Sequence, residues 1–340
     1  MNTTEHPPTT PDVSLLQLTE YRIYDGLVAT GFLICLVIGL PGNCLGLRYF
    51  LQLKKRTLSN LLYIAACSLD TVSSIIHLPV TLNLLNRRHP GLFGNRHFCR
   101  MWYFIVLLVQ AISIYVAMLL ALTRTIVILF PFYKINKKFV IISIIAAVLY
   151  HSTWNTIDMV LQDYVYSYSL GFCTVGPTEA NTDFNTLYMI NFCLCLGIPP
   201  IIVFVSVVVS TVRLNTHHLS DASQRRNRQA SLTIIYFSTI FLICNSFSFF
   251  TNALLTLSLY WPNFPFWSFY NNKFVHFYSW MISEIFCIVL NAALNPLLYL
   301  WRMKAMRTWI KNPSDSFSTT STIRNVNVST ISRSQIEASL

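Results

Sequence analysis

The sequence predicts an all-α membrane protein, a seven-transmembrane helix bundle. Apolar residues make up 54% of the 340 residues, charged residues only 11%, and the mean hydropathy is +0.52. A soluble domain would carry about 25% charged residues. Crossing about 30 Å of hydrocarbon takes roughly 20 residues. Runs of this length lie at 25–52, 58–85, 98–130, 138–161, 187–212, 229–260 and 274–300.

The basic residues predict the orientation of these runs. Lys and Arg collect on the cytoplasmic side of membrane proteins, and here fourteen flank one side of the seven runs and six flank the other. We therefore expect an extracellular tail at 1–24, a transmembrane domain at 25–311 and a disordered cytoplasmic tail at 312–340. Asn2 begins an Asn-Thr-Thr sequon on the outer side, which predicts glycosylation. The net charge of +11 mostly reflects this bias, so it does not indicate a nucleic-acid partner.

Four polar residues fall at one depth of the predicted bundle: Asp70, Ser113, Asn291 and Asn295. Counting 1.5 Å per residue from the inner helix ends places Asp70 about 18 Å and Asn291 about 14 Å into the membrane. Two interpretations stay open from the residues alone. The four can form a pocket for a small hard cation such as sodium, or a neutral Asp70 can join helices by hydrogen bonds.

A proline adds a further acceptor to this polar layer. Pro296 has no N–H, so the carbonyl of Ala292 one turn earlier lacks its helical partner. Within hydrocarbon such a group needs another donor. We therefore expect the Ala292 carbonyl to be one more acceptor in the polar layer.

The cysteines predict one disulfide. Cys99 precedes Arg124 by 25 residues, about 37 Å along a helix, so the two lie on opposite membrane faces. Cys99 is then exposed to the oxidising exterior, where a disulfide persists. Cys173 is the other cysteine in an expected outer loop, which predicts a Cys99–Cys173 bond. The remaining seven are expected to be buried and apolar: Cys35, Cys44, Cys67, Cys193, Cys195, Cys244 and Cys287.

From about 25 to 311, the chain resembles the rhodopsin-like (class A) G-protein-coupled receptors. The resemblance is carried by Gly42-Asn43, "AACSLD" ending at Asp70, Cys99, Ser113, Arg124, Trp154, Pro199 or Pro200, "NPLLY" at 295–299 and "WRMKAMRTWI" at 301–310. The last of these looks like the family's short amphipathic eighth helix along the inner leaflet. The resemblance implies that a network linked to a bound sodium ion is formed by Asp70, Ser113, Asn291 and Asn295. We expect no cofactor besides this ion.

The resemblance also implies partners. A receptor of this family lies in the plasma membrane and activates a heterotrimeric G protein. The residues implied in activation and coupling are Arg124, Phe132, Phe241, Pro296 and Tyr299. Phe132 can instead anchor in the lipid interface, as aromatic residues do. The Ser/Thr-rich tail after Ser314 suits receptor kinases and arrestin, and its composition equally suits an unmodified disordered tail.

Two departures from the family pattern leave a second function open. The acid before the helix-three arginine is replaced by Thr123, and the helix-six "CWxP" reads Cys244-Asn245-Ser246-Phe247. Both the tryptophan and the kinking proline are missing. A seven-helix receptor that does not couple, or that scavenges its ligand, is therefore the alternative function.

The residues in the outer half of the predicted bundle indicate the class of ligand. Val106 stands where amine receptors carry aspartate, and Val289 where opsins carry the retinal lysine. Aromatic outer segments, "YVYSY" at 164–168 and the run at 261–280, favour a peptide, with a small organic or lipid ligand as the alternative. The same aromatic residues also suit a belt at the lipid interface. Candidates for the ligand pocket are His77, Tyr103, Val106, Gln110, Asn252 and Glu284. His77 and Glu284 can instead pair with each other.

Other classes of protein have weaker support. The sequence contains no phosphate-binding GxxxxGK[ST], no HExxH and no Cys/His metal spacing, so we expect no enzyme. A transporter would show repeated halves with broken helices, which the seven runs lack.

Overall fold

The computed structural model describes residues 15–53, 57–85, 91–130, 133, 135–161, 164–167, 172–175, 189–216, 222–260 and 274–311. Its elements are α1 (Leu15–Gln52), α2 (Leu58–Ile76), α3 (Leu78–Leu85), η1 (Gly91–Gly94), α4 (Arg96–Leu129), α5 (Lys137–Leu161), β1 (Tyr164–Ser167), β2 (Phe172–Val175), η2 (Cys193–Gly197), α7 (Ile198–Thr216), α8 (Ala222–Tyr260), α10 (Phe274–Arg302) and α11 (Lys304–Lys311).

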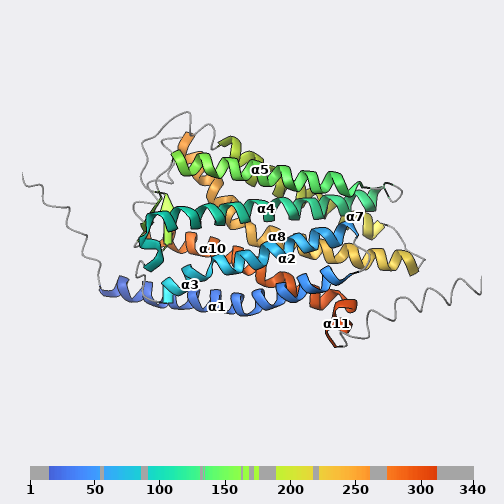
Figure 1. Ribbon diagram of the computed structural model, residues 1–340, viewed down its shortest axis with the longest axis horizontal. Coiled ribbons are helices and arrows are strands. Elements are labelled where there is room, and N and C mark those ends of the chain that lie inside the picture. The colour runs from blue at the N-terminus through green and yellow to red at the C-terminus, as the bar shows by residue number, and fades with distance from the viewer. Residues whose placement is uncertain are drawn as a thin grey trace, which may run out of the picture.

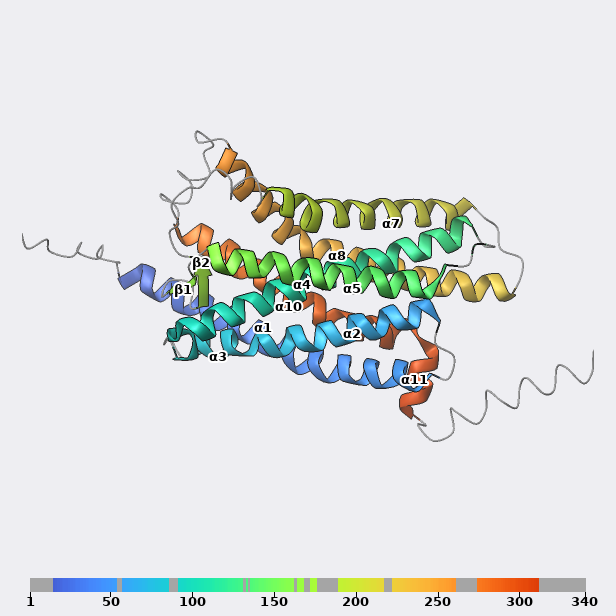
Figure 2. The ribbon, with the colours of Figure 1, turned by 45° about the horizontal axis from the view of Figure 1, so that its top comes forward.

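The long helices lie side by side along the longest axis of the molecule (Figure 1). The short helix α11 turns across one end of the bundle, and the β1–β2 hairpin lies at the other end (Figure 2). We call these the α11 end and the hairpin end. Within the described residues the bundle has the seven expected rods, formed by α1, α2 with α3, α4, α5, η2 with α7, α8 and α10.

The helices have the length and composition of membrane spans. Over the described residues five are long and apolar enough to cross a bilayer: 29–52, 58–83, 96–129, 137–160 and 189–216. The shorter apolar stretches Ser231–Ser246 and Phe286–Arg302 belong to α8 and α10, which run for 39 and 29 residues. At 1.5 Å per residue both helices exceed the roughly 30 Å of a hydrocarbon core.

Three elements differ from the sequence expectation. Helix α1 begins at Leu15, ten residues before the apolar run does. The antiparallel β1–β2 hairpin interrupts the otherwise helical chain, because its strands of four residues are too short to predict from alternation. The expectation that all seven free cysteines are buried was wrong for Cys44 and Cys193, which are exposed. Cys287 is half-buried, and the other four are buried.

The expected run at 58–85 is broken into α2 and α3 by a proline. Pro79 cannot donate a hydrogen bond to the carbonyl one turn earlier and crowds the preceding turn. The chain therefore leaves the helix at His77 and re-enters it at Leu78. The indole N–H of Trp102 on α4 donates to the Ile76 carbonyl over 2.7 Å, which satisfies a group near the break.

Aromatic rings fill the core toward the α11 end. Tyr299 of α10 is fully buried, and its ring centroid lies 5.7 Å from Phe50 of α1, 5.4 Å from Tyr63 of α2 and 6.4 Å from Phe237 of α8. Offset and edge-to-face pairs at such distances are favourable beyond their burial. One tyrosine thus ties three other helices to α10.

Helices α1 and α10 approach closely because Gly42 has no side chain. A Cβ at Gly42 would lie 2.6 Å from Cβ of Pro296. Pro296 is buried within α10 and its ring cannot rotate away. The glycine is therefore required for the contact between the two helices.

We expect Gly42→Ala to lower thermal stability, because relieving this overlap forces the two helices apart at a cost of about 1–3 kcal/mol. The matched control is Gly26→Ala on the same helix, where nothing lies within 4 Å of the added Cβ. Thermal unfolding of the two purified variants measures the difference. Equal melting temperatures would contradict the close contact.

Candidate functional site

The deepest acid is held by a side chain from another helix. Asn295 of α10 donates from Nδ2 to Oδ2 of Asp70 on α2 over 2.7 Å. Both residues are buried. The two polar positions that the sequence placed at one depth are therefore in direct contact between α2 and α10.

The carbonyl freed by Pro296 accepts a hydrogen bond from another helix. Asn43 of α1 donates from Nδ2 to the Ala292 carbonyl over 2.8 Å. Asn43 is fully buried, so this bond satisfies an acceptor that would otherwise face hydrocarbon. The partner itself was not predicted, although Asn43 is the one polar residue in the apolar middle of α1.

An internal cavity of about 20 Å³ adjoins Asp70. Asp70, Ser113 and Asn291 all line it, so α2, α4 and α10 bring three of the four predicted network residues together around one space. A space of this size holds about one water molecule.

The cavity suits a small hard cation by its chemistry. Its three predicted residues offer carboxylate, hydroxyl and amide oxygens, the donors that hard cations prefer. The buried Oδ1 atom of Asn291, which lines the cavity, accepts no hydrogen bond from the described residues, whereas Asn295 does not line it. An unused buried acceptor beside a carboxylate fits an occupant that is positively charged or donates hydrogen bonds.

The cavity extends toward the predicted ligand residues. His77, Val106 and Gln110 line it together with the network residues. Gln110 also donates from Nε2 to Oγ of Ser248 on α8 over 2.9 Å. Tyr103 does not line the cavity and instead lies beside Trp102, with 6.5 Å between ring centroids.

His77 presents one unused nitrogen. Its Nδ1 lies 2.7 Å from the Ser73 carbonyl, and because a carbonyl only accepts, Nδ1 carries the proton. In the neutral ring Nε2 is then an acceptor. Nε2 is buried and has no partner among the described residues.

Four predicted positions lie beyond this description. Asn252 lies in α8 and Glu284 in α10, but their side chains fall outside the described ones. The pairing of Glu284 with His77 therefore stays a prediction. Phe132 and Asn2 fall outside the described residues, as does the Ser/Thr-rich tail.

Arg124 joins α4 to α8 through a serine. Its Nε donates to Oγ of Ser231 over 2.9 Å, and Ser231 is buried. Thr123, which replaces the family's acid, turns its hydroxyl to the Leu120 carbonyl over 3.1 Å. Ser231 was not predictable from the sequence, because a single serine in a helix gives no signal of its partner.

A second contact at the same level joins α4 to α7. The Thr125 hydroxyl lies 2.9 Å from the Ser210 hydroxyl and 3.3 Å from the Ser206 carbonyl. All three residues are buried. Small hydroxyl side chains thus join α4 to α7 beside Arg124.

Helix α8 has a polar residue in place of the missing tryptophan. Asn245 lines the cavity, and its Nδ2 donates to the Phe241 carbonyl one turn earlier over 2.9 Å. Phe241 is buried and also lines the cavity. Between Ala222 and Tyr260 the helix contains no proline, so it lacks the sequence cause of a kink.

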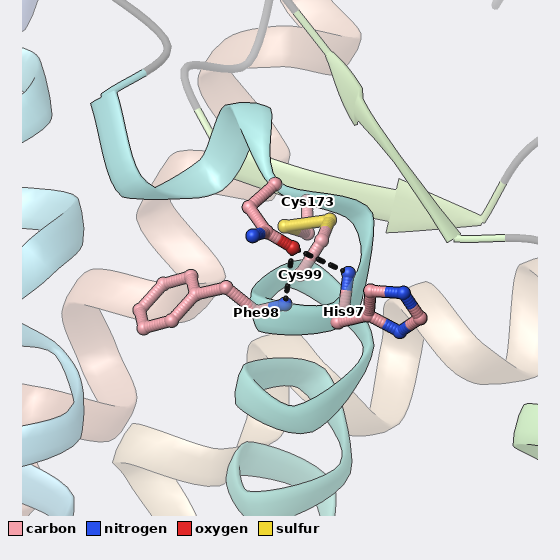
Figure 3. Close-up of a disulfide and its surroundings, with 5 residues drawn as sticks. His97, Phe98, Cys99 and Cys173 are labelled. Atoms are coloured by element: carbon pink, nitrogen blue, oxygen red, sulfur yellow. Dashed lines mark hydrogen bonds between the residues drawn. A yellow bond between two sulfur atoms is a disulfide. The ribbon is translucent and has the colours of Figure 1, made fainter.

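The structure contains the predicted Cys99–Cys173 disulfide at the hairpin end (Figure 3). Cys99 lies in the first turn of α4, and Cys173 lies in β2 opposite Tyr166 of β1. Asn95 caps α4 there, accepting hydrogen bonds from the backbone N–H groups of His97 (2.9 Å) and Phe98 (3.3 Å). The bond therefore attaches the hairpin to a capped helix end.

Comparison with known proteins agrees with this architecture. No protein-family model matches the chain, and no curated protein matches it. A crystal structure of squid rhodopsin is similar, with a TM-score of 0.66 and 18% sequence identity, over 88% of this chain and 87% of the rhodopsin chain. The chain is thus a multi-pass membrane protein with the seven-helix fold of the rhodopsin-like receptors.

Proposed function

We propose that the chain is a cell-surface receptor which couples an extracellular ligand to a heterotrimeric G protein. The observation that carries this proposal is the partly buried hydrogen bond between Arg124 and Ser231, on the α11 side of the Asp70 cavity. Helix α8 contacts α4 through Ser248 near the cavity and through Ser231 toward the α11 end. A ligand that shifts α8 at the cavity would therefore change the contact near the G-protein side.

The Arg124–Ser231 bond is strong enough to change the ratio of two conformations of the bundle. A hydrogen bond to a charged group contributes about 1.5–3 kcal/mol. An interaction present in only one of two conformations shifts their ratio by its full free energy, here about tenfold or more. The bond would favour the closed arrangement while leaving it easier to open than a buried ion pair.

A sodium ion in the Asp70 cavity is the second part of the proposal. Asp70, Ser113 and Asn291 would hold it, and when bound it would supply a positive charge that balances the carboxylate. Without such an ion the carboxylate depends on the Asn295 amide. Ion occupancy would thus stabilise the arrangement of α2, α4 and α10 shown in the structure.

We expect sodium to raise the melting temperature of the wild-type protein and not that of Asp70→Asn. A ligand that binds only the folded state stabilises it by about 2.7 kcal/mol at 100 times its Kd. Asparagine has the same shape without the charge, so the ion loses its counter-charge. Unfolding in sodium chloride and in choline chloride measures the difference, and a wild type that ignores sodium would remove the ion from the proposal.

The ligand would bind above the cavity, at the hairpin end. A cavity of about 20 Å³ is too small for any organic ligand, so only a small group could enter it. That group would donate a hydrogen bond, because His77 Nε2 is an unused acceptor at the cavity. We favour a peptide, which the aromatic outer segments 164–168 and 261–280 would contact.

A screen of peptide pools on cells that express the chain tests this function. We expect at least one pool to dissociate the G protein in wild-type cells and none to do so with Arg124→Ala. Surface expression of both proteins is the control. Equal responses of the two proteins would contradict the role of Arg124.

A receptor that binds its ligand without coupling is the second candidate. The absence of an acid at Thr123 and of a tryptophan at Asn245 favours it. It predicts that labelled ligand binds and is internalised while no G protein dissociates. The two candidates therefore differ in one measured signal and share the fold.

A further inference from the structure

An arginine lies against two aromatic rings at the α11 end of α10. The guanidinium carbon of Arg302 is 5.1 Å from the ring centroid of Trp301 and 5.1 Å from that of Tyr236 on α8. The two rings are 5.5 Å apart. A guanidinium within about 6 Å of a ring is attracted to its face, so α8 and α10 together position this cation.

The rings face outward from the bundle. Trp301 is 60% exposed and Tyr236 is 39% exposed. Along the same helices toward the hairpin end, Leu297 and Ile243 are 44% and 65% exposed. Leu297 precedes Trp301 by one turn, and Ile243 follows Tyr236 by two turns. An apolar strip therefore continues from the aromatic pair along the outside of α8 and α10.

The position along the membrane suits a lipid headgroup. Arg302 is the last residue of α10, and the helix exceeds the hydrocarbon thickness, so its end lies among headgroups. Tryptophan and tyrosine are enriched at this level. A guanidinium matches the geometry of phosphate oxygens and forms two parallel hydrogen bonds to them.

The surrounding charge favours an anionic lipid. Arg225, Arg226 and Arg228 lie in the same helix as Tyr236, 8 to 11 residues before it, or about 12–16 Å beyond it at the α11 end. Arg307 is exposed on α11. Basic clusters next to a membrane span attract anionic lipids, whereas phosphatidylcholine has no net charge for them to attract.

We propose that Tyr236, Trp301 and Arg302 bind the phosphate-bearing headgroup of an anionic phospholipid, with an acyl chain along Leu297 and Ile243. The lipid would contact α8 and α10 together. This site lies on the outside of the bundle and does not depend on the ligand or on G-protein coupling.

Native mass spectrometry of the purified full chain tests the site, with phosphatidylinositol 4,5-bisphosphate as the probe and phosphatidylcholine as the reference lipid. We expect tighter binding of the anionic lipid, weakened about fivefold by Arg302→Gln. Arg213→Gln, an exposed arginine at the same end of α7, should leave the affinity at the wild-type value. Trp301→Leu, which keeps an apolar surface, should also weaken binding.

Melting temperatures in phosphatidylcholine show whether each variant is folded. If Arg302→Gln is not folded, lipid binding by Trp301→Leu tests the site in its place. Equal effects of Arg302→Gln and Arg213→Gln would overturn the site. Equal binding of phosphatidylcholine would overturn the preference for an anionic lipid. If soluble inositol trisphosphate bound as tightly as the lipid, the proposed lipid would be wrong and the ligand would be a free phosphate compound.

Discussion

Replacing Cys99 by serine is expected to destabilise the protein by about 2–5 kcal/mol and to remove most of it from the cell surface. The disulfide closes a loop between positions 74 residues apart, so its loss restores many conformations to the unfolded chain. Both cysteines are fully buried, and without the bond the hairpin would be attached to α4 only by weaker contacts. Surface labelling and thermal unfolding of the purified variant measure the two effects.

Three further cysteine variants serve as controls for this prediction. Cys173→Ser and the double variant should match Cys99→Ser, because each removes one and the same bond. Cys193→Ser, a free and exposed cysteine in the same half of the bundle, should behave as wild type. If Cys99→Ser kept the wild-type melting temperature, the hairpin would be held without the disulfide.

Replacing Ser231 by alanine is expected to raise basal G-protein dissociation about tenfold, since it removes the hydrogen bond by which Arg124 holds α8. Alanine is the better helix former, so the helix itself is not weakened. The expected change is in the ratio of closed to open bundles, without loss of the fold. Energy transfer between labelled G-protein subunits in cells measures the basal signal.

Ser238 provides a matched control for this variant. It lies two turns further along α8, is buried, and its hydroxyl has no partner among the described residues. Ser238→Ala removes the same atom without removing a contact to Arg124, so the basal signal should stay at the wild-type value. Equal signals from the two variants would show that the Arg124 contact does not restrain α8.

The seven rods and the polar layer were predictable because hydrocarbon penalises polar groups strongly. Asp70, Ser113 and Asn291 stood out in apolar runs, and helical rise alone placed them at one depth. The disulfide followed from sidedness, since Cys99 and Arg124 had to lie on opposite faces. Helix length and the cost of buried polarity therefore fixed most of this architecture.

The partners of these groups were not predictable, because they depend on the rotation of each helix about its axis. Ser231 and Ser248 look alike in the sequence of α8, yet one bonds Arg124 and the other Gln110. The sequence shows that the Ala292 carbonyl lacks its helical donor, but it does not show that Asn43 supplies one. The buried Cys195 thiol was expected to be apolar, but it donates to Oδ1 of Asn191 one turn earlier in the same helical segment over 2.9 Å.

Nucleotide exchange on purified G proteins tests the proposed coupling most directly, with the chain in lipid nanodiscs and no ligand added. We predict that Ser231→Ala accelerates the release of GDP from at least one class of heterotrimer, and that Arg124→Ala added to Ser231→Ala returns the rate to that of the G protein alone. A Ser231→Ala protein that is folded and accelerates no class of G protein would contradict the account.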